Sequence, residues 1–263
     1  MADVYPSESR PRRRWGRRLL ITLIVLLVLL GVAGVVLDRF AASFAERQIA
    51  DRVTQEMRSQ RATSAAPEVS VGGVPFLTQV ARGRYREITI LLRDFSVPGN
   101  GDRPVKMPLL DIRAKDVRAP LQTLRTRQGD IIASTVTGTG TLNYVDVAAL
   151  AGQPGLTLAE QNGRLVGKAP VEVLGQKFNV TGIANVAVRG DAVQVRIEGL
   201  TAEGLTAVPL VQNFINGYAK KLNLDIKIPP LPLQMKVKDV KASPAGLVVT
   251  ARADEVPLNT GKP

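Results

Sequence analysis

Residues 19–37 read LLITLIVLLVLLGVAGVVL, an uncharged stretch whose only polar side chain is Thr22. As an α-helix it would be about 28 Å long, close to the hydrocarbon thickness of a bilayer. The arginines that precede it are Arg10, Arg12, Arg13, Arg14, Arg17 and Arg18. Positively charged flanks stay on the cytoplasmic side of a membrane. We therefore predict a cytoplasmic basic tail (residues 1–18), a single-pass anchor in the cell membrane (19–37) and an exported, extracytoplasmic domain (38–263).

A cleaved signal peptide is the alternative interpretation of this stretch. The apolar core of a signal peptide is usually about 7–15 residues long, which is shorter than the stretch found here. Small residues beyond it, from Ala41 to Ala45, offer a weak cleavage site, and Arg17-Arg18 before two leucines is faintly similar to a twin-arginine signal. A buried helix of a soluble domain is disfavoured because the stretch is apolar on every face.

Two residue types that support much enzyme chemistry are missing, because the 263 residues include no histidine and no cysteine. Without them there is no Ser-His-Asp triad, no cysteine nucleophile and no ordinary zinc site. We therefore expect a protein that is not an enzyme and that uses no metal or other cofactor. An enzyme that acts on glycans through carboxylates stays open as a lesser alternative.

The chain is strongly basic, with a net charge of +12. Residues 38–263 carry 29 Lys and Arg against 21 Asp and Glu, so the exported part keeps a charge of +8. Such a surface attracts anionic partners. Outside a cell these would be anionic lipids or envelope polymers, whereas nucleic acid lies in another compartment. Alternatively, the excess charge only aids solubility.

A second helical pattern follows the apolar stretch directly, from Asp38 to about Gln60. The apolar residues at helical spacing are Phe40, Phe44, Val53 and Met57, with Ile49 close to the same stripe. Charged residues occupy the other side of this helix. We expect the apolar stripe to dock onto the protein's own domain, and a helix lying on the outer leaflet of the membrane is the alternative.

Residues 68–83 read EVSVGGVPFLTQVARG and combine several local signals. Alternating apolar residues predict a short strand that is broken by Gly72-Gly73. Pro75 can begin a helical turn, and Gly83 ends that turn.

Alternation of apolar and polar residues then predicts half-buried antiparallel strands through most of the remaining chain. They are expected over residues 84–97, 105–117, 131–142, 177–189, 193–198, 224–228, 233–240 and 247–253. Asn162-Gly163 and Gly190-Asp191 are hairpin signals. Helices are expected over residues 144–150 and 208–222, and a basic loop or short helix over 118–129. The exported part is therefore predicted to be a single α+β domain.

Two motifs carry a resemblance to a known family. Directly after the apolar stretch, the pattern D-R-x-A-x-x-x-A-E-x-x-I-A is matched by Asp38, Arg39, Ala41, Ala45, Glu46, Ile49 and Ala50. Further on, G-x-P-F-L-T-Q and G-x-Y are matched by Gly73, Pro75, Phe76, Leu77, Thr78, Gln79, Gly83 and Tyr85. In these residues the chain resembles the LmeA-like phospholipid-binding proteins of the actinobacterial cell envelope. The likeness is specific in this first part of the exported domain and only architectural from there to about Ala253.

The resemblance implies a fold like that of the tubular lipid-binding proteins, in which a long, curved antiparallel sheet wraps around a helix and encloses an apolar tunnel. It also implies that the protein binds, and in some cases transfers, envelope phospholipid and so supports the maintenance of envelope lipid or lipoglycan. A scaffolding protein of the envelope that holds no lipid is the alternative function.

Two sets of side chains are candidates for a lipid site. Acyl chains need a smooth apolar lining, and a phosphate head group needs a few Arg or Lys donors at the mouth of the site. The candidate lining residues are Phe76, Leu77, Ile88, Ile90, Leu210, Phe214 and Tyr218. The candidate head-group residues are Arg82, Arg84, Arg86, Lys220 and Lys221. Plain core packing and solvated surface charge are the alternatives for the two sets.

Overall fold

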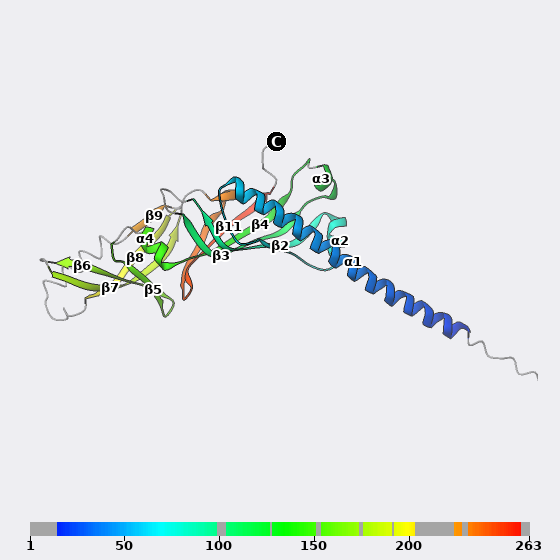
Figure 1. Ribbon diagram of the computed structural model, residues 1–263, viewed down its shortest axis with the longest axis horizontal. Helices are drawn as coiled ribbons and strands as arrows, with labels where there is room; N and C mark the ends of the chain where they lie inside the picture. The colour runs from blue at the N-terminus through cyan, green and yellow to red at the C-terminus, as the bar shows by residue number, and fades with distance from the viewer. Residues whose placement is uncertain are drawn as a thin grey trace, which may run out of the picture.

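The computed structural model describes residues 15–98, 104–126, 128–150, 154–173, 176–190, 192–202, 224–227 and 231–258. The protein is α+β: a long N-terminal helix is followed by two antiparallel sheets and several short helices (Figure 1). Within the described residues neither sheet closes on itself, so the structure is not a closed barrel.

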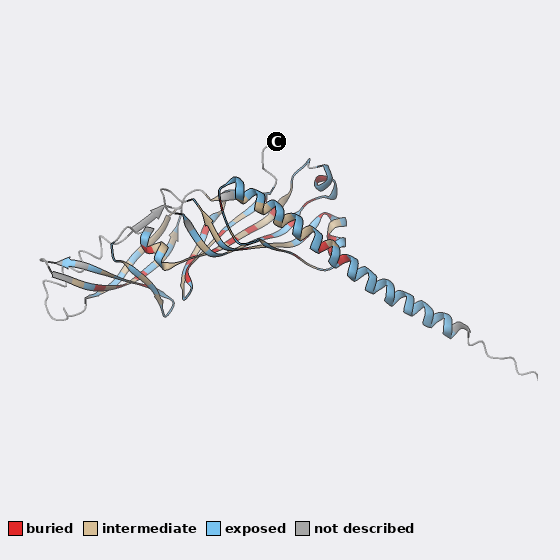
Figure 2. Ribbon diagram, viewed as in Figure 1, coloured by how far each residue is buried: buried red, intermediate tan, exposed pale blue. Residues whose placement is uncertain are grey.

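Helix α1 (Trp15–Ser59) runs without interruption from the apolar stretch into the domain. Its first half projects away from the sheets, and Figure 2 shows the described side chains of this half, from residue 17 onward, as exposed. Every side chain from Leu19 to Leu37 is exposed, whereas Asp38 and Ala42 are buried. Among the described residues, α1 is the one helix long and apolar enough to cross a bilayer, and a signal sequence passes the same test. Because residues 19–37 bury no side chain, the part from Asp38 onward keeps its core without them.

The first sheet has six antiparallel strands in the order β1-β2-β3-β4-β11-β10. The strands are β1 (Glu68–Gly72), β2 (Arg84–Val97), β3 (Val105–Arg118), β4 (Ile132–Leu142), β10 (Lys236–Ser243) and β11 (Gly246–Pro257). The second half of α1 lies along this sheet (Figure 1). Helices α2 (Phe76–Arg82) and α3 (Leu121–Thr126) lie at the end of the sheet nearest the projecting part of α1.

The second sheet has five antiparallel strands in the order β5-β6-β7-β8-β9. The strands are β5 (Thr157–Gln161), β6 (Arg164–Val173), β7 (Gln176–Arg189), β8 (Ala192–Ala202) and β9 (Leu224–Lys227). Helix α4 (Tyr144–Leu150) connects β4 to this sheet, and a 3-10 turn (Pro232–Gln234) precedes β10. An apolar cluster joins the two sheets, with Val240 and Leu247 on one side and Val186 and Val193 on the other.

Most predicted elements are confirmed. The structure has the long strands of the first sheet, the short helices over residues 76–82 and 144–150, and the hairpin at Asn162-Gly163. The basic segment 118–129 contains α3. The predicted helix over residues 208–222 lies outside the described residues.

The predicted docking face of α1 is wrong for Phe40 and Phe44, whereas Ile49, predicted close to the same stripe, does pack against the domain. Helix α1 does pack against the domain, but Phe40 and Phe44 point to solvent and are 68% and 62% exposed. The residues that pack against the domain are Ala41, Ala42, Ala45 and Ile49. At 3.6 residues per turn, the buried pair Asp38 and Ala42 faces away from Phe40 and Phe44. Small alanines also let the helix axis approach the sheet closely, because the interaxial distance depends on the side chains at the contact.

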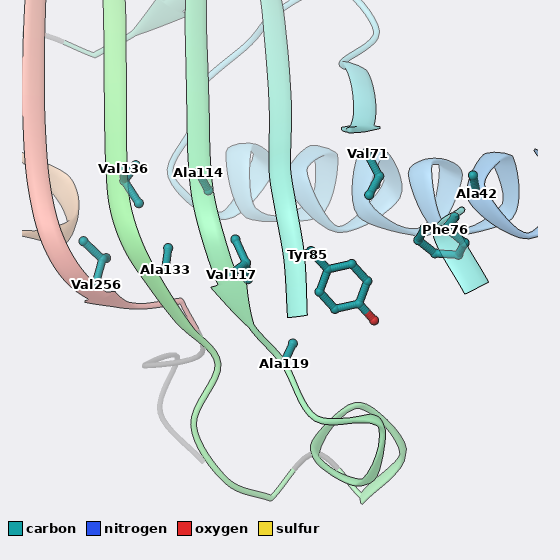
Figure 3. Packing of buried hydrophobic residues seen from close by; sticks show 10 residues of the cluster. All are labelled: Ala42, Val71, Phe76, Tyr85, Ala114, Val117, Ala119, Ala133, Val136 and Val256. Atoms are coloured by element: carbon teal, nitrogen blue, oxygen red, sulfur yellow. The ribbon is translucent and has the colours of Figure 1, made fainter. Parts of the chain in front are cut away.

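The main core lies between α1, α2 and the first sheet (Figure 3). Ala42 from α1 and Phe76 from α2 meet Tyr85 at the start of β2, and the Phe76 and Tyr85 rings are 6.1 Å apart in a tilted arrangement. Val117 and Val136, each 1% exposed, continue this core across β3 and β4. The core therefore ties the exit of α1 to the strands behind it.

Two carboxylates of α1 fasten the helix to the domain. The Leu77 N–H donates to Asp38 Oδ1 at 2.7 Å, and the Val71 N–H donates to Glu46 Oε1 at 2.9 Å. Pro75 gives α2 no side-chain cap, so the buried carboxylate of Asp38 caps it from another helix. Such a cap typically contributes about 1 kcal/mol. Glu46 in turn satisfies an amide of the edge strand β1.

A buried amide, Gln79, holds the loop beside this contact. Its Nε2 donates to the main-chain oxygens of Gly72 (3.2 Å) and Gly73 (2.9 Å), and its Oε1 accepts from the Arg86 N–H (3.0 Å). Gly83 then ends α2 in the left-handed region at φ 62°, where a Cβ would lie 2.8 Å from the Cα of Pro120. The motif residues of the family resemblance therefore build the joint between helix and sheet.

Replacing Gln79 with leucine should lower the stability of residues 38–263 by at least about 2 kcal/mol. The leucine fills a similar volume but leaves three main-chain groups without their partner, and each unsatisfied buried group costs about 1–3 kcal/mol. Thermal unfolding followed by circular dichroism should show a melting temperature lower by about 4 °C or more. The control is Gln161→Leu on an exposed position of β5, which should change the melting temperature little. Equal shifts for the two variants would contradict this role of Gln79.

Candidate functional site

One face of the first sheet is formed by rows of apolar residues that lie opposite one another on neighbouring strands. We call these the apolar rows. The first row is Val71, Ile88, Ala114, Val136 and Ala253. The second row is Val69, Ile90, Ile112, Gly138 and Ala251. The third row is Leu92, Leu110, Gly140 and Val249. Because strand side chains alternate between faces, every residue of the three rows points to the same side, and none is polar.

The opposite face of the same strands is almost entirely polar. Between the first and second rows it carries Thr89, Arg113, Thr137 and Arg252, which are aligned across the sheet. Ion pairs hold part of this face, with Arg113 bound to Asp111 at 2.7 Å and Arg252 bound to Asp254 at 2.9 Å. The sheet is therefore amphipathic, and the apolar rows form its protein-facing side.

The side chains of the apolar rows extend least from the sheet at the centre of the rows, where the residues are small. Gly138 and Gly140 lie two residues apart on β4, in neighbouring rows, and neither has a side chain on this face. Two methionines lie over them: a Cβ on Gly138 would be 3.7 Å from Sδ of Met235, and one on Gly140 would be 2.9 Å from Sδ of Met107. Methionine is unbranched and adaptable, so it can change rotamer when another apolar group takes its place.

Next to the first row, the pairing between neighbouring strands is interrupted along a line that crosses the sheet. The registers on either side agree, yet Arg86, Asp116, Ser134 and Glu255 have no pairing partner in their strands. Asp116 and Glu255 adopt left-handed backbone at φ 49° and 50°. As a result Tyr85 and Ile88, three residues apart, both pack into the main core, which a regular strand would not allow.

A cavity of about 340 Å³ lies at this break, where β2 begins and β3 ends. Its lining residues are Arg84, Tyr85, Arg86, Asp116, Arg118 and Ser134. The guanidinium of Arg118 is bound to the carboxylate of Glu255, and Ser134 Oγ donates to the Asp116 main-chain oxygen at 3.4 Å. The guanidinium groups of Arg84 and Arg86 have no ion-pair or hydrogen-bond partner among the described residues. The cavity therefore presents two free cationic donors, the chemistry that binds a phosphate.

The structure places the predicted site residues in different surroundings. Ile88 and Ile90 belong to the apolar rows, and Arg84 and Arg86 line the cavity. Phe76 is buried in the main core, and Leu77 is 46% exposed on α2. Arg82 is exposed at the end of α2 and does not line the cavity. The remaining candidates, Leu210, Phe214, Tyr218, Lys220 and Lys221, lie outside the described residues.

Sequence reasoning missed Arg118 as a member of the site. Antiparallel pairing brings it opposite Arg84, because β2 begins where β3 ends. The signal was present in part: two long strands with one turn between them predict that the start of the first meets the end of the second. The break at Asp116 carried no such signal, because an aspartate gives no indication of left-handed backbone unless its surroundings are known.

The comparisons with known proteins agree with this description. The family described as LmeA-like phospholipid-binding matches residues 36–252. A search of curated proteins found no match, and a search of solved structures found none either. The matched range begins at the end of the apolar stretch and takes in the joint, the cavity and every residue of the apolar rows except Ala253. The chain therefore belongs to the LmeA-like phospholipid-binding family.

Proposed function

We propose that this protein is anchored in a cell membrane and binds a phospholipid outside the cytoplasm, to extract or present it rather than to cleave it. The observation that carries the proposal is the set of apolar rows that begins beside a basic cavity. Membership of a phospholipid-binding family supports the same ligand class. The absence of histidine and cysteine supports a function without catalysis.

The acyl chains would lie on the apolar rows. Each methylene buried there contributes about 0.8 kcal/mol and needs no directional partner. From Ile88 to Leu92 the rows extend about 13 Å along the strands. In this proposal the chains displace Met107 and Met235 from the glycines of β4, and the sheet forms a tubular site together with α1.

The phosphate head group would bind at Arg84 and Arg86. Arg86 precedes Ile88 by two residues, so the cationic donors and the first apolar row are about 7 Å apart along the strand. Arg84 and Arg86 are exposed on either side of the buried Tyr85, so they lie on the opposite face of the sheet from the apolar rows, and a bound lipid would bend around the start of β2 to reach both. Two free guanidinium groups favour an anionic lipid, because hydrogen bonds between ionised partners are stronger than neutral ones. Lys220 and Lys221 remain predictions for the same role.

The anchor would be residues 19–37, with residues 1–18 in the cytoplasm and the domain from residue 38 outside. The projecting, exposed half of α1 supports a surrounding lipid phase for these side chains. The arginines before the span support the orientation. The envelope of the cell is then the place of function.

Native mass spectrometry of residues 38–263, expressed in a host with ordinary phospholipids and purified without detergent, tests the proposal. We expect a mass increment of one or two phospholipids that disappears after extraction with organic solvent. A protein that stays free of lipid, even after incubation with anionic liposomes, would contradict phospholipid binding. The same result would favour an envelope scaffold.

Gly138→Leu should abolish or strongly reduce lipid occupancy in that experiment. The leucine fills the lowest part of the apolar rows, where an acyl chain would lie. Thr137→Leu is the matched control, because the neighbouring residue faces the polar side of the same strand. Thermal unfolding of both variants checks that the fold persists, since overpacking costs about 1–3 kcal/mol. Full occupancy in Gly138→Leu would exclude the apolar rows as the acyl site.

Replacing both Arg84 and Arg86 with serine should weaken binding of phosphatidylglycerol by about tenfold or more. A hydrogen bond to a charged group contributes about 1.5–3 kcal/mol, which corresponds to a factor of about 10–100 in affinity. The control replaces Arg164 and Arg189, which are exposed on the second sheet, and removes the same charge. Lipid transfer from fluorescent donor vesicles measures the affinity. An equal loss in both double variants would assign the effect to overall charge.

A further inference from the structure

Large apolar side chains are exposed around the point where α1 joins the domain. Val74 lies in the loop before α2 and is 57% exposed, and Leu77 of α2 is 46% exposed. On α3, Leu121 and Leu124 are 46% and 41% exposed. We call these four residues the end patch. Single exposed apolar residues are common on proteins, but four of them on α3, α2 and the loop before α2 form a candidate interaction surface.

The end patch lies at the end of the apolar stretch. The Leu77 N–H is bonded to Asp38, which directly follows Leu37, the last residue of that stretch. The Ala119 N–H, two residues before α3, donates to the Gly83 oxygen at 2.9 Å and so holds α3 beside α2. Figure 1 shows both short helices at the end of the sheet next to the projecting part of α1. When α1 spans a bilayer, the end patch is therefore at the level of the bilayer surface.

Arginines are the commonest charged residues around the end patch, and the acidic residues nearest to them are Glu87 and Asp116. Residues 72–86 and 119–126 contain four arginines (Arg82, Arg84, Arg86 and Arg125) and no aspartate or glutamate. On α1 the outward side chains next to the span are Arg39, Phe40 and Phe44, all exposed. The nearby Asp38 is buried and already caps α2. Apolar side chains with several arginines nearby are the composition of a surface that lies in the interface of an anionic bilayer.

We propose that the end patch docks onto the anionic surface of the same membrane that holds α1. This rests on the proposed anchoring by residues 19–37. The side chains of Leu77, Leu121 and Leu124 enter the boundary between head groups and acyl chains, and the arginines contact lipid phosphates. The Arg84–Arg86 cavity then lies at head-group level, where it can bind the phosphate of a lipid that is still in the bilayer.

The full chain, which has no cysteine of its own, allows clean single-cysteine labelling with a nitroxide. The test variants are Leu77→Cys and Leu124→Cys, both at exposed positions, reconstituted in vesicles of equal parts phosphatidylcholine and phosphatidylglycerol. The control for water is Val145→Cys on α4, which is 80% exposed and distant from the end patch in Figure 1. The control for lipid is Val28→Cys inside the span.

Electron paramagnetic resonance compares collisions of each label with oxygen, which concentrates in lipid, and with a nickel chelate, which stays in water. We expect the oxygen-to-nickel ratio at Leu77 and Leu124 to be several-fold above that at Val145 and below that at Val28. Ratios at both positions equal to that at Val145, with Val28 in lipid, would overturn docking alone. A water-like ratio at Val28 would instead overturn the anchor, and so the proposed function's membrane part. Spin–spin broadening that disappears on dilution with unlabelled protein would assign the end patch to a second copy and overturn the proposal.

The contribution of the arginines to docking is tested separately. In vesicles of phosphatidylcholine alone, the ratio at Leu77 and Leu124 should fall toward the value at Val145, because the arginines lose their anionic partners. An unchanged ratio would overturn the part of the proposal that assigns docking to charge.

Discussion

The hydrogen bond from the Leu77 N–H to the buried carboxylate of Asp38 fixes the relation between helix α1 and everything that follows it. It begins α2, whose Gln79 then holds the strand β1 through Gly72 and the strand β2 through Arg86. Displacing the Asp38 carboxylate would leave its buried charge and the start of α2 without partners. The cost in free energy is larger than that of losing an apolar contact. The joint therefore sets where β2 starts, and with it the position of the cavity.

The sheet behind the joint obeys a second constraint, the alternation of strand side chains. Because β2, β3, β4 and β11 keep one register, an apolar residue on one strand meets an apolar residue on the next over three consecutive rows. The break at Asp116 and Glu255 ends this regularity and turns two consecutive side chains outward. The apolar rows therefore come from the regular part of the sheet, and the polar cavity comes from the interrupted part next to it.

Much of this arrangement could be predicted from the sequence. The alternation around Ile88, Ile90 and Ile112 identified the strands and their inner face, and Gly83 identified the end of α2. The docking face of α1 could not be predicted from hydrophobicity, because Asp38 turns the alanines inward and leaves Phe40 outside. The cavity could not be predicted either. It depends on Arg118 and Ser134 meeting across strands, and on a break in the backbone pairing that no residue type predicts. The local sequence pattern predicts the helices and strands, whereas the site depends on the register between neighbouring strands.

The uninterrupted course of α1 also limits what the protein can reach. Its 45 residues form a rod of about 68 Å, and no proline or glycine occurs between Gly34 and Ser59 where the span becomes part of the domain. A flexible tether would let the domain search a wide volume above its anchor, but a continuous helix gives it one height and one tilt. In the proposed anchored state the protein would move only laterally within its bilayer, and transport of a lipid to a distant layer would require a separate, diffusing partner.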